Sequence, residues 1–189
     1  FHHLTSKEHL SSTMLQLRYD RKRLGFLEHY GSISLARYPD RSPCVDWHRA
    51  VDLWSEGSGY LRRLETGMAN LWSSLFVCDG RLPLHVDMVG KGVTTMGMII
   101  ANESSLKIAS KEQVVQADSG DIFALDPEDE HGAETEGRFI FATRDLKTHE
   151  LPTVEKARRL FLRDISRISQ HLEKAAHHDL SPLGVGHSC

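Results

Sequence analysis

The feature that most restricts the fold of this chain is a series of short apolar runs between residues 71 and 143. The runs are four to eight residues long and are separated by turn residues; they cover residues 71–78, 84–89, 94–101, 106–109, 113–116, 121–125 and 138–143. Short strands at regular spacing with turn residues between them are typical of sandwiches and barrels. No alternation of strand and helix patterns occurs there, so a parallel sheet with crossover helices is not expected.

Helical and mixed patterns flank this region. Residues 5–30 repeat Leu and Met at helical spacing behind a capping arrangement, which predicts a helix. Residues 33–38 predict an early strand, and residues 60–68 predict a further turn of helix. From Thr153 as N-cap to about residue 177, apolar side chains keep one face and charged side chains mostly the other. This pattern predicts an amphipathic helix that packs on the β region or on a partner.

The bulk composition excludes several classes of function. The chain has 189 residues, 40% hydrophobic and 26% charged, which suits one globular domain, and its net charge of −3 gives no overall attraction to nucleic acid or anionic membrane. Three widely spaced cysteines without a CxxC pair argue against a disulfide framework. No apolar run approaches the roughly 20 residues of a membrane span, and no signal-peptide pattern opens the chain. We therefore expect an intracellular, cytoplasmic protein without membrane contact, with the nucleus as an open alternative.

Two short segments carry the residues of a candidate metal site. His85 and Asp87 are two residues apart, so on a strand both side chains leave the same face. His131 follows 46 residues later, which leaves room for about four short strands that return the chain beside its starting strand. Two imidazoles and one carboxylate can occupy one face of an octahedral metal and leave the other face open. The acidic residues around His131 leave a second interpretation open, in which it is a surface histidine of a solvated loop.

Two arginines follow His131. Arg138 and Arg144 are six residues apart, so on a regular strand both point to one face, while Phe139 and Phe141 take the other. An arginine that faces the interior of an apolar barrel needs an anionic partner, and a dicarboxylate co-substrate would supply one through a bidentate pair. The alternative is an arginine at the rim that makes a surface ion pair.

The order His85-x-Asp87, then His131, then Arg138 or Arg144 resembles the Fe(II)/2-oxoglutarate-dependent dioxygenase superfamily over residues 71–146. The resemblance implies a mainly β fold with flanking helices around a double-stranded β-helix core (jelly roll, cupin-like). It also implies that His85, Asp87 and His131 bind Fe(II), and that one of the two arginines binds the distal carboxylate of 2-oxoglutarate. The local pattern favours Arg138 for this role, and Arg144 stays open.

The implied activity uses O2 and 2-oxoglutarate to hydroxylate or demethylate a C–H bond, with release of succinate and CO2. One structural domain in four parts is then expected. Residues 1–70 form a helical or mixed part that packs on the core, 71–150 the metal-binding jelly roll, 151–178 the C-terminal helix and 179–189 a tail.

Two other classes of protein fit parts of the same pattern. The segment from Gly120 to His131 is also similar to the second cupin motif, although the first cupin motif should read HxH rather than HxD. A non-catalytic jelly-roll binding module is the third interpretation. The primary substrate stays open among nucleic acid, a protein side chain and a small metabolite, because specificity depends on loops outside the core motifs.

Overall fold

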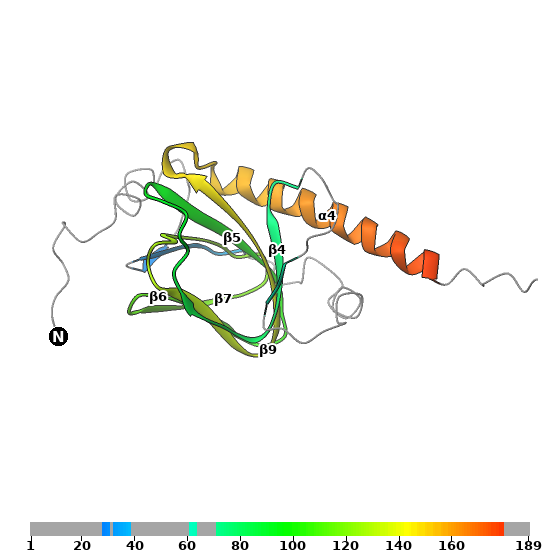
Figure 1. The fold of residues 1–189 in the computed structure, drawn as a ribbon, viewed down its shortest axis with the longest axis horizontal. Coiled ribbons are helices and arrows are strands. Elements are labelled where there is room, and N and C mark those ends of the chain that lie inside the picture. Colours follow the sequence, from blue (N-terminus) through cyan, green and yellow to red (C-terminus); the bar gives the residue numbers. More distant parts are fainter. Residues whose placement is uncertain (1–27, 31, 39–60, 64–70, 180–189) are drawn as a thin grey trace, which may run out of the picture.

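The computed structural model describes residues 28–30, 32–38, 61–63 and 71–179 (Figure 1). These residues form strands β1 (Glu28–Tyr30), β2 (Ile33–Ala36), β3 (Leu61–Arg63), β4 (Ser74–His85), β5 (Val93–Asn102), β6 (Leu106–Ser110), β7 (Gln113–Ala117), β8 (Ile122–Leu125) and β9 (His131–Lys147), then the 3-10 turn η1 (Thr148–Glu150) and helix α4 (Val154–Asp179).

The strands join into one antiparallel sheet in the order β1-β2-β8-β5-β9-β4-β3, with β6 paired to β7 and to the start of β9. Strands β4 and β9 are long and pair with each other along almost their whole length. The second half of β9 also pairs with β5, whereas its first residues pair with β6. The same two strands therefore take part in both layers of a curled, nearly closed barrel. This arrangement is the expected jelly roll, or double-stranded β-helix, and the predicted fold class is confirmed.

The curl of β4 has a local cause at Gly80. The register between β4 and β9 shifts between Asp79 and Arg81, and Gly80 between them has a φ of 68°. A left-handed backbone of this kind favours glycine. The shift leaves two extra residues on the β9 side, and such an irregularity bends a strand pair and increases its twist. The bend lets one continuous strand pass from the layer of β5 to the layer of β6.

Several strand predictions are confirmed and others need correction. The four runs between residues 94 and 125 form β5 to β8, which are the strands expected between the two histidines. The runs 71–78 and 84–89, however, contribute to one strand that ends at His85. Residues 86–89 leave the sheet because the Asp87 N–H donates to the Pro127 carbonyl (2.9 Å) rather than to a neighbouring strand.

Two predicted helical segments are strands where the structure describes them. Residues 28–30, at the end of the helix predicted for 5–30, form β1 and pair with β2. Residues 61–63, in the turn of helix predicted for 60–68, form β3 and pair with β4. Both helix predictions are wrong at these positions, because pairing with a neighbouring strand overrides the local helical spacing. The remainder of each segment lies outside the described residues.

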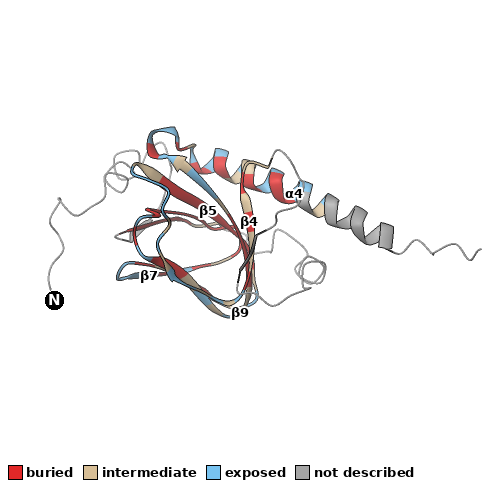
Figure 2. Cartoon of the chain, viewed as in Figure 1, coloured by how far each residue is buried: buried red, intermediate tan, exposed pale blue. Residues whose placement is uncertain are grey.

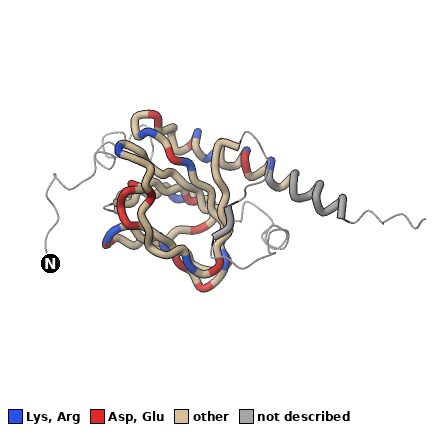
Figure 3. The backbone as a smooth tube through the Cα atoms, in the orientation of Figure 1, with Lys and Arg blue, Asp and Glu red and all other residues tan. Residues whose placement is uncertain are grey.

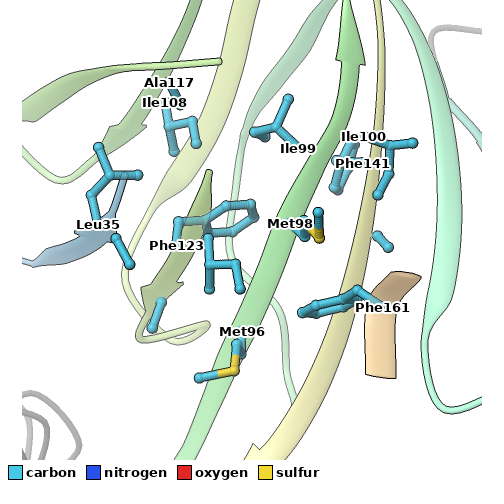
Figure 4. Close-up of a cluster of buried hydrophobic side chains, with 14 of the residues drawn as sticks. Leu35, Met96, Met98, Ile99, Ile100, Ile108, Ala117, Phe123, Phe141 and Phe161 are labelled. Atoms are coloured by element: carbon cyan, nitrogen blue, oxygen red, sulfur yellow. The ribbon is translucent and has the colours of Figure 1, made fainter. Parts of the chain in front are cut away.

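The core fills both sides of the central strand β5. Residues 94–101 of this strand are all buried, as expected for a strand covered on both faces. Figure 4 shows that side chains of β2, β5, β6, β7, β8, β9 and α4 contribute to the buried cluster. Gly97 allows the tightest contact, because a Cβ there would lie 2.2 Å from the ring of Phe123.

Helix α4 confirms the amphipathic prediction. Its buried side chains Val154, Ala157, Phe161 and Ile165 recur at helical spacing and face the sheet, while the opposite side is exposed (Figure 2). Thr153 acts as the expected cap, since its Oγ1 accepts the Lys156 N–H (3.2 Å). The Trp72 ring meets Phe161 edge to face at 4.9 Å. No helix in the described part of the chain is long and apolar enough to cross a membrane.

A buried carboxylate fastens α4 to the start of β4. The Asp164 side chain is fully buried and accepts hydrogen bonds from the Ser73 backbone N–H (2.8 Å) and the Ser73 hydroxyl (2.9 Å). The neighbouring Arg163 guanidinium balances its charge at 2.9 Å. Hydrogen bonds to a buried charged group are among the stronger polar contacts in proteins.

We predict that Asp164→Ala lowers the free energy of unfolding by about 2–3 kcal/mol, because both Ser73 donors lose their buried acceptor. The matched control is Glu155→Ala, which removes an exposed partner of Arg159 on the same helix and should cost below about 0.5 kcal/mol. Urea denaturation followed by circular dichroism measures both. Equal effects of the two substitutions would contradict the role given to Asp164.

Candidate metal centre

The structure brings His85, Asp87 and His131 together. His85 ends β4, His131 begins β9, and the two are register partners with ring centroids 4.4 Å apart. Asp87 lies just beyond β4, with Oδ1 3.7 Å from His85 Nε2 and Oδ2 3.5 Å from His131 Nε2. One ligand atom from each residue lies within 4.8 Å of the others. The three donors therefore converge on a volume of the size that one metal ion needs.

The hydrogen bonds of the two imidazoles select the form that binds metals. His85 Nδ1 is 2.8 Å from the Pro83 carbonyl, and His131 Nδ1 is 2.7 Å from the Asp129 carbonyl. Each carbonyl accepts a hydrogen bond from the Nδ1–H group. The proton stays on Nδ1, so Nε2 keeps its lone pair, and the hydrogen bond fixes the ring orientation. Because both Nε2 atoms face Asp87, the donor set fits a divalent transition metal.

The loop before His131 is partly buried and held by hydrogen bonds. Asp126 and Asp129 are buried, and His131 is only 7% exposed, so the interpretation of His131 as a surface histidine of a solvated loop is wrong. Asp126 accepts the Glu128 N–H at 2.9 Å through its side chain and the Asp129 N–H at 3.1 Å through its carbonyl. These turns hold the carbonyl that orients His131.

Lys111 ties this loop to the β6–β7 hairpin. Its N–H donates to the Glu130 carbonyl (2.7 Å), and its ammonium lies 2.8 Å from Asp129 Oδ1. Lys111 has a φ of 52°, a conformation uncommon for a residue with a side chain. Its positioning role could not be read from the sequence, where Lys111 is one exposed lysine in a polar turn.

A cavity of about 740 Å³ extends from the three residues into the jelly roll. Its walls come from β4, β5, β6, β8 and β9, and most of the lining side chains are apolar. His85, Asp87 and His131 supply polar atoms at one end, and Thr95, Thr143 and Asp145 supply them on another part of the wall. The convergent donors thus open onto a largely apolar interior, an arrangement typical of small-molecule sites.

The phenylalanines, not the arginines, occupy the inner positions of β9. Phe139 and Phe141 line the cavity, as do Thr143 and Asp145. The two arginines do share a parity, as expected, but they alternate with the phenylalanines: Arg138 lies outside the cavity lining, and the exposed Arg144 lies at its edge. The physical reason is local alternation on β9, where Arg138 directly precedes the inward-facing Phe139 and Arg144 directly follows Thr143.

Arg138 makes the surface ion pair that the sequence left open. Its Nη2 and Nε lie 2.7 and 3.1 Å from Glu103 Oε1, and its backbone N–H donates to Glu103 Oε2 at 2.7 Å. Arg138 is not among the residues that line the cavity. Arg144 is exposed and borders the cavity at the Thr143–Asp145 end.

Cys78 is the free cysteine within the described residues, and it lies apart from the site. Burial, and secondarily the charge of Asp79, raises the pKa of its thiol to about 12. The thiol therefore stays protonated near neutral pH, which disfavours a nucleophilic role.

Comparisons with known proteins give no family assignment. No family model matches the sequence, and no curated protein matches it. Among solved structures, a cupin-2 domain protein from Shewanella frigidimarina is 12% identical, with a TM-score of 0.36, over 52% of this chain and 90% of that one. A Klebsiella pneumoniae protein with a double-stranded β-helix domain is 19% identical, with a TM-score of 0.36, over 49% and 81%. A predicted oxalate decarboxylase from Thermotoga maritima is 13% identical, with a TM-score of 0.34, over 61% and 80%. Similarities this weak carry no argument about function.

We predict that His131→Ala weakens binding of one equivalent of Co²⁺ on the order of 100-fold or more, because one of three convergent ligands is lost. Isothermal titration calorimetry measures the affinity. His149→Ala is the matched control, since His149 is exposed and pairs with Glu150 outside the site. Wild-type affinity in folded His131→Ala protein would remove His131 from the ligand set.

Proposed function

We propose that this protein is a non-haem Fe(II) oxygenase that hydroxylates or demethylates a C–H bond, with 2-oxoglutarate as co-substrate. One oxygen atom of O2 enters the C–H bond and the other enters succinate, while C1 of 2-oxoglutarate leaves as CO2. The observation that carries the proposal is the convergence of two Nε2 atoms and one carboxylate at one end of an apolar cavity.

The donor set favours iron among the common metals. Two histidines and one carboxylate with open positions are typical of Fe(II) oxygenases, whereas structural zinc sites use four closed ligands rich in Cys. His85, Asp87 and His131 would hold the ion. When bound, iron supplies the O2 activation that amino-acid side chains lack.

The protein's own contribution is orientation of the ligands and an apolar wall beside them. The Pro83 and Asp129 carbonyls keep both Nε2 atoms available, and the Pro127 carbonyl holds the backbone beside Asp87. The apolar lining offers a surface that can hold a C–H bond close to the three ligands.

The contacts of the two arginines change the assignment of the co-substrate residue. Arg138 is already paired with Glu103, and a carboxylate ligand would have to displace that pair. Arg144 is the one Lys or Arg among the described residues that line the cavity. We therefore assign the distal carboxylate of 2-oxoglutarate to Arg144, although the sequence pattern favours Arg138.

A second candidate is a cupin-type metalloprotein that binds its substrate directly and uses no 2-oxoglutarate. The observation that favours it is the apolar inner face of β9, where Phe139 and Phe141 stand in place of arginines. If this candidate is correct, the protein binds a metal but releases no succinate. If it is also an enzyme, it consumes O2 only when the metal is present. A non-catalytic binding module, the third class, expects neither O2 uptake nor succinate.

We predict that wild-type protein with Fe²⁺ releases succinate from 2-oxoglutarate, and that Arg144→Ala raises the KM for 2-oxoglutarate at least about tenfold, because a charge-assisted pair contributes roughly 1.5–3 kcal/mol. The matched control is Arg138→Ala, for which we expect a KM within about twofold of wild type. The assay follows succinate by NMR.

The contrary outcomes are distinct. A larger effect in Arg138→Ala would return the co-substrate role to that residue. O2 uptake that requires the metal but yields no succinate would replace the dioxygenase proposal with the cupin-type candidate.

A further inference from the structure

We propose that the cavity binds an uncharged, mainly apolar small molecule with one hydrogen-bonding end. The polar end would lie at Thr95, Thr143 and Asp145, beside Arg144, which the proposed function leaves to the co-substrate, and the apolar end would point toward His85, Asp87 and His131. The choice of which end meets the metal rests on the proposed function, whereas the chemical class of the molecule rests on the cavity itself.

One wall of the cavity is aromatic. Phe76 on β4 stacks on Phe141 on β9 at 5.0 Å with an interplanar angle of 13°, and Phe141 stacks on Phe139 at 5.7 Å and 21°. All three rings line the cavity. This continuous apolar surface suits a ring system or an alkyl chain, and it offers no partner to a charged group.

Aliphatic side chains complete the middle of the cavity. Leu106 and Ile108 come from β6, Ile99 from β5 and Leu125 from β8, and all four are buried. Figure 3 shows that the charged residues fall mainly in loops, at strand ends and on α4. The volume of about 740 Å³ lies within the usual range for small-molecule pockets, roughly 300–1,000 Å³.

The polar groups of the cavity gather along three neighbouring strands. Thr95 on β5 is the register partner of Asp145 on β9 and donates its hydroxyl proton to Asp145 Oδ1 at 2.6 Å. Thr143 on β9 is the register partner of Ser74 at the start of β4. The candidate metal ligands lie at the other ends of β4 and β9, where His85 pairs with His131. The cavity therefore has one polar end, with two threonine hydroxyls beside Asp145 and Arg144, a metal-ligand end and an apolar middle.

The mouth beside the candidate metal ligands is also apolar. Met88 is 98% exposed and Val89 37% exposed, and both also line the cavity. Exposed apolar side chains that lie next to one another often mark a binding surface. Recognition of nucleic-acid phosphates needs several Lys or Arg side chains, and the described lining offers Arg144 alone. Of the three substrate classes left open by the sequence, a small metabolite fits this mouth.

The test uses 1-octanol as probe, because it has an apolar chain and one hydroxyl. We expect saturable binding by NMR titration of the folded, full-length protein. With Mn²⁺ added as a paramagnetic ion, the terminal methyl protons should relax faster than the C1 methylene protons. The reverse order would overturn the proposed orientation.

Two matched substitutions on one strand pair separate cavity binding from general adhesion. Ala133 lines the cavity opposite Ile108, whereas Ala109 is one step along the same ladder and outside the lining. We expect Ala133→Leu to weaken octanol binding at least tenfold and Ala109→Leu to leave it within twofold. Equal affinities in both variants, or no saturable octanol binding in wild type, would overturn the proposed substrate class.

Failure of this inference and failure of the proposed function are distinguishable. The protein could bind octanol, lose that binding in Ala133→Leu and release no succinate. This result would support the substrate class and overturn the dioxygenase proposal. Succinate release without octanol binding would support the dioxygenase proposal and overturn the proposed substrate class. Saturable binding of a single-stranded oligonucleotide in place of octanol would also overturn the substrate class.

Discussion

The pairing of the end of β4 with the start of β9 is the constraint on which the rest of the site depends. It places His85 opposite His131, while Asp87 beyond the strand end completes the cluster. Gly132 makes this close approach possible, since a Cβ there would lie 2.7 Å from the Leu82 carbonyl oxygen. The register shift between Leu82 and His85 falls at the same point, so the chain reaches the site through a local irregularity rather than a regular ladder.

The same two strands also create the cavity. Because β4 and β9 belong to both layers of the jelly roll, the interior between the layers stays open while each layer keeps its backbone hydrogen bonds. Helix α4 covers part of the outer surface, with Phe161 buried against the core and Asp164 bound to Ser73. The core packs on both faces of β5, and on the inner face it leaves the cavity that Thr95 and Ile99 help to line.

Local sequence determines much of the architecture. The strands β5 to β8 and helix α4 follow from short apolar runs and from helical spacing, which are properties of adjacent residues. The distance to His131 predicts a return beside His85, which the pairing of β4 with β9 confirms. The shared strand face predicted for His85 and Asp87 is wrong in its geometry, because β4 ends at His85 and Asp87 reaches the cluster from the segment beyond it. The helical spacing around residues 28–30 and 61–63 misleads because strand pairing comes from residues far away in the sequence.

The sequence by itself therefore determined the class of fold, the amphipathic helix and the three candidate metal ligands. Only the tertiary structure decided which face of β9 turns inward, because that parity depends on how His131 meets β4. The tertiary structure also decided that Arg138 pairs at the surface with Glu103, which lies 35 residues earlier in the chain. Arg144 is then the arginine beside the cavity. Ion pairs between distant segments and the polarity of an enclosed space arise only when the strands are assembled, so neither leaves a local pattern.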